Sequence, residues 1–218
     1  MNTHTRTKAG LAALLTATAL ALTACGSDSK SGDDKEIDGA KKATKSASPS
    51  ASPSDDGIQR PKITLPSDDN LVFEGQQTGD PKKDAVLKDN AERLRAVDEA
   101  IGKRDPQSDA VAFYSTGDAR AAAADWINGL IKDGVTVTGT VRYYNRKVTF
   151  LKDGSAALTY CGDESKGYTK NFKTQKVNVT PATKKSYVFY NERLEKDKHG
   201  VWQSTKGLSE RGFEACQP

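Results

Sequence analysis

The hydrophobic pattern of this chain changes its period once, at Gly134–Val135, and this change restricts the fold more than any other feature. Before it, apolar residues recur at spacings of three and four, which is typical of helices that bury one face. After it, apolar and polar residues alternate, which is typical of strands that bury one face. Helices followed by strands predict an α+β domain with an antiparallel sheet.

Two helical regions are predicted before the change of period. The first begins with Asp80 as its cap and Pro81 in its first turn, and it ends near Gly102. Its apolar face consists of Leu87, Ala91, Leu94, Val97 and Ile101. The second region spans residues 110–132 and is expected to break near Gly117.

About four strands are predicted after the change, in a meander that includes a two-residue turn at Asp153-Gly154. They cover residues 135–151, 155–160, 185–195 and 201–208. Within the first, Val141 falls on an odd position and Val148 on an even one, and a regular strand cannot point both to one face. We expect either a bulge near residues 145–147 or two separate strands joined by a loop there.

The first residues of the chain have the layout of a secretory signal. Arg6 and Lys8 precede an uncharged apolar run from Leu11 to Leu22, and small residues follow up to Cys25. The run is too short for a membrane-spanning helix, which needs about 20 apolar residues. The sequence therefore predicts secretion.

The tetrapeptide Leu22-Thr23-Ala24-Cys25 resembles a lipobox. The resemblance implies that residues 1–24 are a signal peptide and that the Cys25 thiol receives a diacylglyceryl lipid. The lipid would anchor the protein to the outer face of the cell membrane. The alternative is an ordinary secretory signal that happens to end near a cysteine.

Residues 25–60 are predicted to be the lipidated cysteine followed by a disordered stalk. The segment is rich in serine, proline, aspartate and lysine, and Ile37 and Ile58 are its only large apolar residues. Such a composition buries too little surface to offset the entropy lost on ordering.

Residues 61–218 are predicted to form one domain, in which 61–79 are an ordered lead-in strap.

Cys161 and Cys216 remain as a pair once Cys25 is assigned to the lipid. In an oxidising compartment such a pair predicts a disulfide. The alternatives are a zinc site and a nucleophilic cysteine, which both call for histidine. Outside the signal the only histidine is His199, in a predicted turn.

Charge argues against a nucleic-acid partner. Removal of residues 1–24 takes away Arg6 and Lys8 and no acid, which lowers the formal net charge from +4 to +2. Nucleic-acid binding needs a concentrated basic patch. Residues 166–185 are predicted to be a lysine-rich loop, which favours contact with an anionic wall polymer or phospholipid headgroups. A solvated loop at a sheet edge is the alternative.

Four short motifs carry a resemblance to a known superfamily. They are residues 139–143 (Gly-Thr-Val-Arg-Tyr), 160–165 (Tyr-Cys-Gly-Asp-Glu-Ser), 200–202 (Gly-Val-Trp) and 214–216 (Glu-Ala-Cys). With them, residues 60–218 resemble small secreted bacterial lipoproteins that have an NTF2-like (cystatin-like α+β roll) domain. The resemblance implies helices packed on a curved antiparallel sheet that encloses a cone. It leaves function open, because such rolls include enzymes, ligand binders and scaffolds.

Catalytic groups are scarce in this sequence. Enzymes of the superfamily place a carboxylate or a histidine inside the cone, but here His4 leaves with the signal and His199 lies in a turn. Asp118 and Asp125 are the best-placed acids, and a solvated helix face explains both. The sequence has no metal-binding cluster, glycine-rich phosphate loop or Gly-x-Ser-x-Gly motif. We therefore predict no metal, no cofactor and no catalytic residue.

Aromatic residues are the remaining candidates for a site. Those singled out are Tyr114, Trp126, Tyr143, Tyr160, Tyr187 and Tyr190. They are expected either to line a pocket in the cone or to fill the core between helices and sheet. Residues 187–190 put aromatic side chains on both faces of one strand. One face is therefore expected to stay exposed unless another segment or a partner covers it.

These features together predict a lipid-anchored surface protein that acts as a non-catalytic scaffold or accessory binding domain. Its partner would be the membrane through Cys25, with an envelope protein or wall polymer as a further partner. The alternative is a small-molecule pocket protein, with or without enzyme activity. An open cavity with an inward carboxylate would favour the alternative, and a solid core would favour the scaffold.

Overall fold

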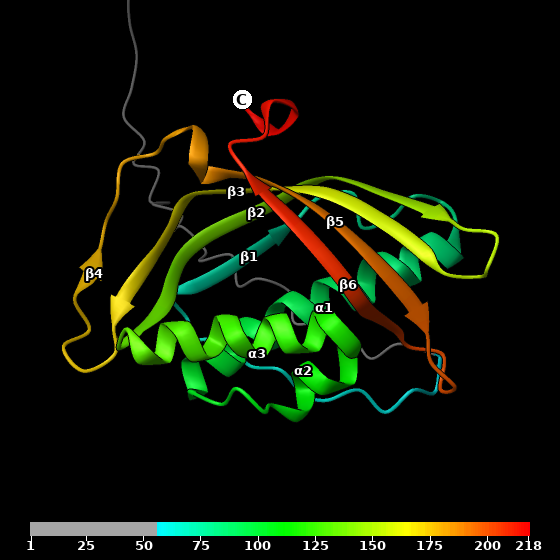
Figure 1. Cartoon of the computed structure of the whole chain (residues 1–218), viewed down its shortest axis with the longest axis horizontal. Helices are drawn as coiled ribbons and strands as arrows, with labels where there is room; N and C mark the ends of the chain where they lie inside the picture. Colours follow the sequence, from blue (N-terminus) through cyan, green and yellow to red (C-terminus); the bar gives the residue numbers. More distant parts are fainter. Residues whose placement is uncertain (1–55) are drawn as a thin grey trace, which may run out of the picture. The chain divides into compact units, whose positions relative to one another are not determined.

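The computed structural model describes residues 56–218. The predictions for the signal peptide, for the lipid on Cys25 and for the stalk up to residue 55 lie outside the described residues. The described part contains three α-helices and six strands, with short 3₁₀ turns at Lys184–Ser186 and Glu214–Cys216 (Figure 1).

The three helices precede most of the sheet, as the change of hydrophobic period predicted. They are α1 (Pro81–Lys103), α2 (Asp109–Tyr114) and α3 (Gly117–Lys132). The Asp80 side chain caps α1 by accepting a hydrogen bond from the backbone N–H of Lys82 at 2.9 Å. The predicted break in the second helical region lies at residues 115–116, directly before Gly117.

The sheet has two strands more than predicted. Its strands are β1 (Asp69–Phe73), β2 (Val135–Phe150), β3 (Ala156–Asn171), β4 (Val177–Asn178), β5 (Tyr187–Lys196) and β6 (Trp202–Arg211). They are arranged in the order β1-β2-β3-β5-β6, and β4 pairs with β3. All pairs are antiparallel except β1 with β2, which is parallel. The prediction of a loop from residue 166 was wrong for 166–171, because β3 extends through them along β2.

A bulge, and not a loop, reconciles the two parities within β2. The β2–β3 register shifts between Tyr144 and Lys147, and Asn145 has a positive φ of 52°. The bulge turns Arg146 inward, where it is buried and donates to the carbonyl oxygen of Leu87 at 2.6 Å. A second register shift follows Gly139, between residues 140 and 142. β2 and β3 bend across the helices (Figure 1), so the described domain has the predicted α+β roll.

Two apolar clusters form the core. The first lies between α1 and the middle of the sheet and includes Leu71, Leu87, Leu158, Tyr160 and Leu194. The second joins the three helices to the start of β6 and includes Ile101, Val111, Tyr114, Ile127 and Val201. Burial of each large apolar side chain contributes about 1.5–3 kcal/mol, so these clusters supply the main driving force for folding.

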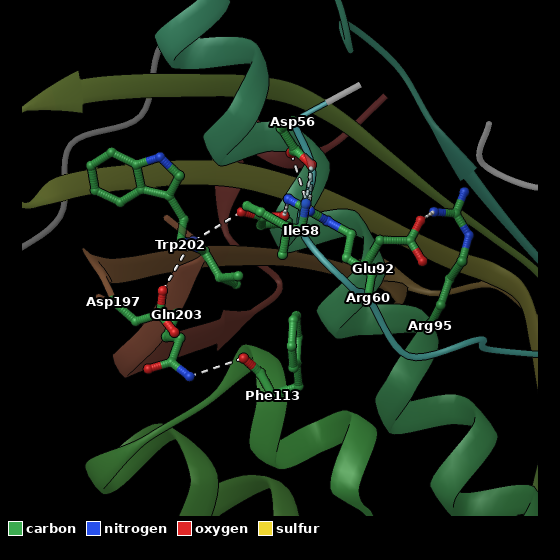
Figure 2. Close-up of polar contacts among 11 residues, drawn as sticks. Asp56, Ile58, Arg60, Glu92, Arg95, Phe113, Asp197, Trp202 and Gln203 are labelled. Carbon is green, nitrogen blue, oxygen red and sulfur yellow. Dashed lines mark hydrogen bonds and ion pairs between the residues drawn. The ribbon is translucent and has the colours of Figure 1, made fainter. Parts of the chain in front are cut away.

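Residues 56–60 were predicted to be the end of the disordered stalk, and that prediction was wrong for them, because Ile58 and Arg60 contact the domain. Together with residues 61–68 they form a lead-in segment (residues 56–68) that lies on the domain. Its Ile58 and Ile63 pack against the second core cluster. The backbone N–H of Thr64 donates to the buried carboxylate of Glu99 in α1, at 2.8 Å. Arg60 contacts Asp56 (Figure 2) and also pairs with Asp89 of α1. The prolines of this segment prevent regular structure, and these contacts hold it in place instead.

The C-terminal residues cover the outer face of the sheet. Cys161 of β3 and Cys216 form the predicted disulfide, with their Cα atoms 5.6 Å apart. The ring of Phe213 stacks on that of Phe189 at 4.6 Å, and the Tyr144 hydroxyl donates to the carbonyl oxygen of Cys216. The outer aromatic face of β5 is therefore covered in part by the chain's own end, and Tyr187 and Phe189 stay half-buried.

Candidate functional site

A cavity of about 640 Å³ lies between the helices and the inner face of the sheet. Apolar side chains make up much of its wall, including Leu94, Val97, Ala122, Ala123, Leu130, Val137 and Val141. Aromatic rings of Trp126, Tyr143, Tyr160, Tyr168 and Tyr190 add to it. Cavities of this size and lining are typical of small-molecule sites.

The cavity reaches the surface between α3 and β6. Trp126 is 53% exposed and Leu208 is 69% exposed, and both line the cavity. β5 pairs with β3 only as far as Asp163, and β4 pairs with β3 only from Thr169. The stretch of β3 between these pairings, residues 164–168, has neither strand beside it and contributes to the lining. A ligand can therefore enter without unpairing the sheet.

Four carboxyl groups from four different elements face the cavity: Asp69 of β1, Asp98 of α1, Glu164 of β3 and Glu192 of β5. The folding pattern places them there, since each falls on an inward position of its element. They divide into two that are paired with arginine and two that are not.

Glu192 is the centre of a buried polar network. Its carboxylate accepts hydrogen bonds from the hydroxyl groups of Tyr160 and Ser204, the latter at 2.7 Å. Arg93 Nη1 of α1 completes the set at 3.3 Å, and Arg93 Nε in turn donates to Ser115 Oγ at 3.0 Å. This network satisfies the Glu192 charge and ties α1 to β5 and β6.

Glu164 is paired in the same way nearer the surface. Arg211 Nη1 of β6 lies 2.6 Å from one carboxylate oxygen, and the Tyr190 hydroxyl donates to the other at 3.0 Å. Burial raises the pKa of Tyr190 well above its usual value, with the negative charge of Glu164 adding to the effect. Tyr190 therefore remains a neutral hydrogen-bond donor.

Asp69 and Asp98 have no such partners. Within residues 56–218, neither carboxyl group receives a hydrogen bond or an ion pair, and Asp69 is only 8% exposed. Burial raises the pKa of Asp69 to about 6, and the neighbouring charge of Asp68 adds to this. Burial also raises the pKa of Asp98 well above its usual value, followed by repulsion from Asp69 and Glu164. Asp69 therefore titrates near pH 6, and the pKa of Asp98 also lies above that of an ordinary carboxyl group.

Three tyrosine rings form one wall beside these acids. The rings of Tyr160 and Tyr190 stack at 4.8 Å, and Tyr143 meets them edge-on at 5.9 and 6.4 Å. Among the described residues, the Tyr143 hydroxyl has no hydrogen-bond partner. Burial raises its pKa well above the usual value, and the charge of Asp98 contributes, so it too stays protonated.

The structure separates the aromatic residues singled out in the sequence. Trp126, Tyr143, Tyr160 and Tyr190 line the cavity together. Tyr114 does not, because it is fully buried in the core among the helices. Tyr187 is half-buried at the start of β5 and is also outside the lining. Four of the six therefore line the cavity, Tyr114 belongs to the core, and Tyr187 belongs to neither.

The lining acids were missed in the sequence. Asp118 and Asp125, the acids considered there, are exposed on α3 and do not line the cavity. Glu192 could have been found, because it shares the inward alternation of Val188, Tyr190 and Leu194 along β5. Asp69 lay in a segment where no strand was predicted, so nothing in the pattern assigned it a face.

Two negative results apply to the described part of the chain. No group of three or more histidine, cysteine, aspartate or glutamate residues there is arranged to hold a metal ion. No helix within residues 56–218 is both long enough and apolar enough to cross a membrane.

The fold and the site together define an α+β roll with an internal, partly acidic cavity. No family model matches the chain, and no curated protein matches it either.

Solved structures with similar arrangements include the intermembrane space region of the chloroplast protein ARC6 (13% identity, 57% of this chain and 92% of that chain, TM-score 0.37). A ketosteroid isomerase-like protein from Erwinia carotovora atroseptica is also similar, with 18% identity over 61% of this chain and 97% of that chain and a TM-score of 0.40. A third similar structure is Aln2 from a Streptomyces species, with 19% identity over 58% of this chain and 88% of that chain and a TM-score of 0.38. Values this low carry no argument about function, so the site is interpreted from its own geometry.

Proposed function

We propose that the domain binds a small molecule in the cavity between the helices and the sheet. The observation that carries this proposal is the presence of two unpartnered carboxyl groups, Asp69 and Asp98, in a cavity of about 640 Å³. Burial of a carboxyl group without a partner costs folding free energy, and an unfilled cavity loses packing contacts. A ligand that fills the space and pairs with the acids offsets both costs.

A solid core would have favoured a pure scaffold. The domain instead has an open cavity with inward carboxyl groups, the feature that distinguishes the alternative interpretation of the sequence. The proposed role is binding rather than catalysis. Two of the acids, Glu164 and Glu192, are held by arginine, and the described lining contains no histidine, lysine or cysteine to act as a second proton carrier or nucleophile.

We also propose that the domain is displayed on the outer face of the cell membrane through a lipid on Cys25. The disulfide between Cys161 and Cys216 supports an oxidising compartment, since such bonds persist mainly outside the cytosol. A wall polymer or an envelope protein remains the proposed further partner of this surface-displayed domain.

Blocking the cavity should weaken binding of an apolar molecule. Ala122 of α3 is exposed yet lines the cavity, so Ala122→Phe places a ring at the opening without entering the core. We expect the full-length wild type to increase the fluorescence of the uncharged dye Nile red. The dye affinity should fall by about tenfold or more in the variant, which corresponds to about 1.4 kcal/mol.

Ala121→Phe is the matched control, because Ala121 is exposed on the same helix and does not line the cavity. It should bind the dye as the wild type does. Equal dye affinity in Ala122→Phe, Ala121→Phe and wild type, with unchanged circular dichroism, would place the dye elsewhere and favour the scaffold.

A further inference from the structure

The charges that line the cavity do not balance. Four carboxyl groups face it, but only two cationic side chains do, Arg93 and Arg211. These arginines lie against Glu192 and Glu164, at 3.3 and 2.6 Å. When every group is ionised, two negative charges are therefore uncompensated, one on Asp69 and one on Asp98.

We propose that the ligand of this cavity is an organic cation: a protonated amine attached to an apolar body. The proposal rests on the proposed binding function and names the class of molecule bound. The ammonium group donates hydrogen bonds to the carboxylates of Asp69 and Asp98, and the apolar body lies against the helix side chains. Such charge-assisted hydrogen bonds are about twice as strong as neutral ones.

The wall of the cavity suits both parts of such a molecule. The rings of Tyr143, Tyr160 and Tyr190 line the same cavity as the acids and add apolar surface to it. Leu94 and Val97 provide the apolar surface on the helix side. Asp69 itself indicates that a partner is missing. It lines the cavity, is more than nine-tenths buried and has an oxygen without a hydrogen-bond partner in the described chain.

Other classes of ligand fit less well. A metal ion needs more ligands than this pair of carboxyl groups provides, and the described residues contain no suitable set of three. An anion would be repelled by Asp69 and Asp98, since both arginines already have partners. A neutral molecule would leave the two carboxyl groups either unpaired or protonated.

Amine binding should strengthen as the pH rises. Burial raises the pKa of Asp69 to about 6, so Asp69 is largely protonated at pH 5, and burial also raises the pKa of Asp98 well above its usual value. Because the amine binds the ionised acids, affinity increases as they lose protons. The charged and titratable groups that face or adjoin them are Asp68, Arg93, Tyr143, Tyr160, Glu164, Lys170, Tyr190, Glu192 and Arg211.

The test uses three probes with one apolar body: 1-adamantylamine (cation), 1-adamantanol (neutral) and 1-adamantanecarboxylate (anion). Calorimetric titration of the full-length chain at pH 7.5 should give an affinity for the amine at least about tenfold higher than for the alcohol. The carboxylate should not bind measurably. At pH 5 the preference for the amine should fall about tenfold, while the alcohol affinity stays constant.

Asp98→Asn and Asp69→Asn should each lose the preference for the amine and keep the affinity for the alcohol. Asp125→Asn removes the same charge from an exposed position outside the lining and should behave as wild type. Ionisation of Asp98 inside the cavity costs folding free energy as the pH rises through its raised pKa. Asp98→Asn should therefore melt no lower than wild type at pH 7.5, which separates lost charge from lost fold.

An alcohol affinity equal to that of the amine would overturn the cation proposal and leave the cavity as a binding site for neutral molecules. Binding of Nile red without binding of any adamantane probe would overturn it as well. Failure of Nile red and of all three probes would instead remove the proposed function on which it rests.

Discussion

Replacing Gly139 with alanine is expected to destabilise the domain by about 2–5 kcal/mol. Gly139 lies in β2 with a φ of +96°, a conformation that L side chains rarely adopt. A Cβ atom at this position would stand 2.2 Å from the carbonyl oxygen of Lys166 in β3, which is far inside contact distance. The Cβ is fixed to the β2 backbone and the oxygen belongs to the β3 backbone, so neither can move alone. The paired strands must therefore separate to relieve the clash. Urea unfolding of the full-length protein measures the loss.

Gly154→Ala separates the two causes. Gly154 also has a positive φ, +84°, but an added Cβ there would meet no atom within 4 Å. This variant should lose only the backbone contribution, about 1–2 kcal/mol. Equal losses in Gly139→Ala and Gly154→Ala would show that β2 and β3 do not approach each other as described.

Removing the positive charge of Arg60 is expected to cost about 3–5 kcal/mol. Arg60 Nη2 lies 2.9 Å from the carboxylate of Asp89, which is 1% exposed and also accepts the backbone N–H of Trp202 at 2.8 Å. Arg60→Met keeps the apolar stem but leaves Asp89 as an uncompensated buried charge. Burial already raises the pKa of Asp89, and loss of Arg60 should raise it further. The destabilisation should therefore be larger at high pH and should decrease as the pH falls, because protonation of Asp89 removes the uncompensated charge.

Two controls accompany this variant. Arg193→Met breaks exposed ion pairs with Asp153 and Glu195 and should cost far less than Arg60→Met, because solvent screens exposed pairs. The double variant Arg60→Met with Asp89→Asn removes both charges and should recover much of the loss. A cost for Arg60→Met as small as that for Arg193→Met would mean that the lead-in segment is not held by the Asp89 pair.

Local sequence rules were sufficient for the helices, and they predicted the change of face within β2 but left a bulge and a loop as alternatives for it. The Asp80-Pro81 cap, the break before Gly117 and the opposite parities of Val141 and Val148 each depend on a few neighbouring residues. β1 and β4 were missed because their five and two residues owe their conformation to pairing with distant strands. The extension of β3 was missed because its side chains beyond Asp163 are mostly polar.

The candidate site was predictable only in part. Four of the six singled-out aromatics line the cavity, since large rings on inward strand positions gather between sheet and helices. The acids could not be placed, because the cavity depends on how far the sheet bends away from α3, and the bend arises from two bulges in β2. Asp69 lies on β1 and Asp98 on α1, and the charge of one affects the pKa of the other. Their proximity depends on the same curvature of the sheet.

The most direct measurement of the central claim is native mass spectrometry of the protein as purified from its own cells. The cavity account predicts a one-to-one adduct with a small molecule that contains a basic nitrogen. The adduct should be present in wild type and Ala121→Phe and absent from Ala122→Phe. Spectra without any adduct in all three proteins, or with the same adduct in all three, would contradict the claim that this cavity binds a ligand.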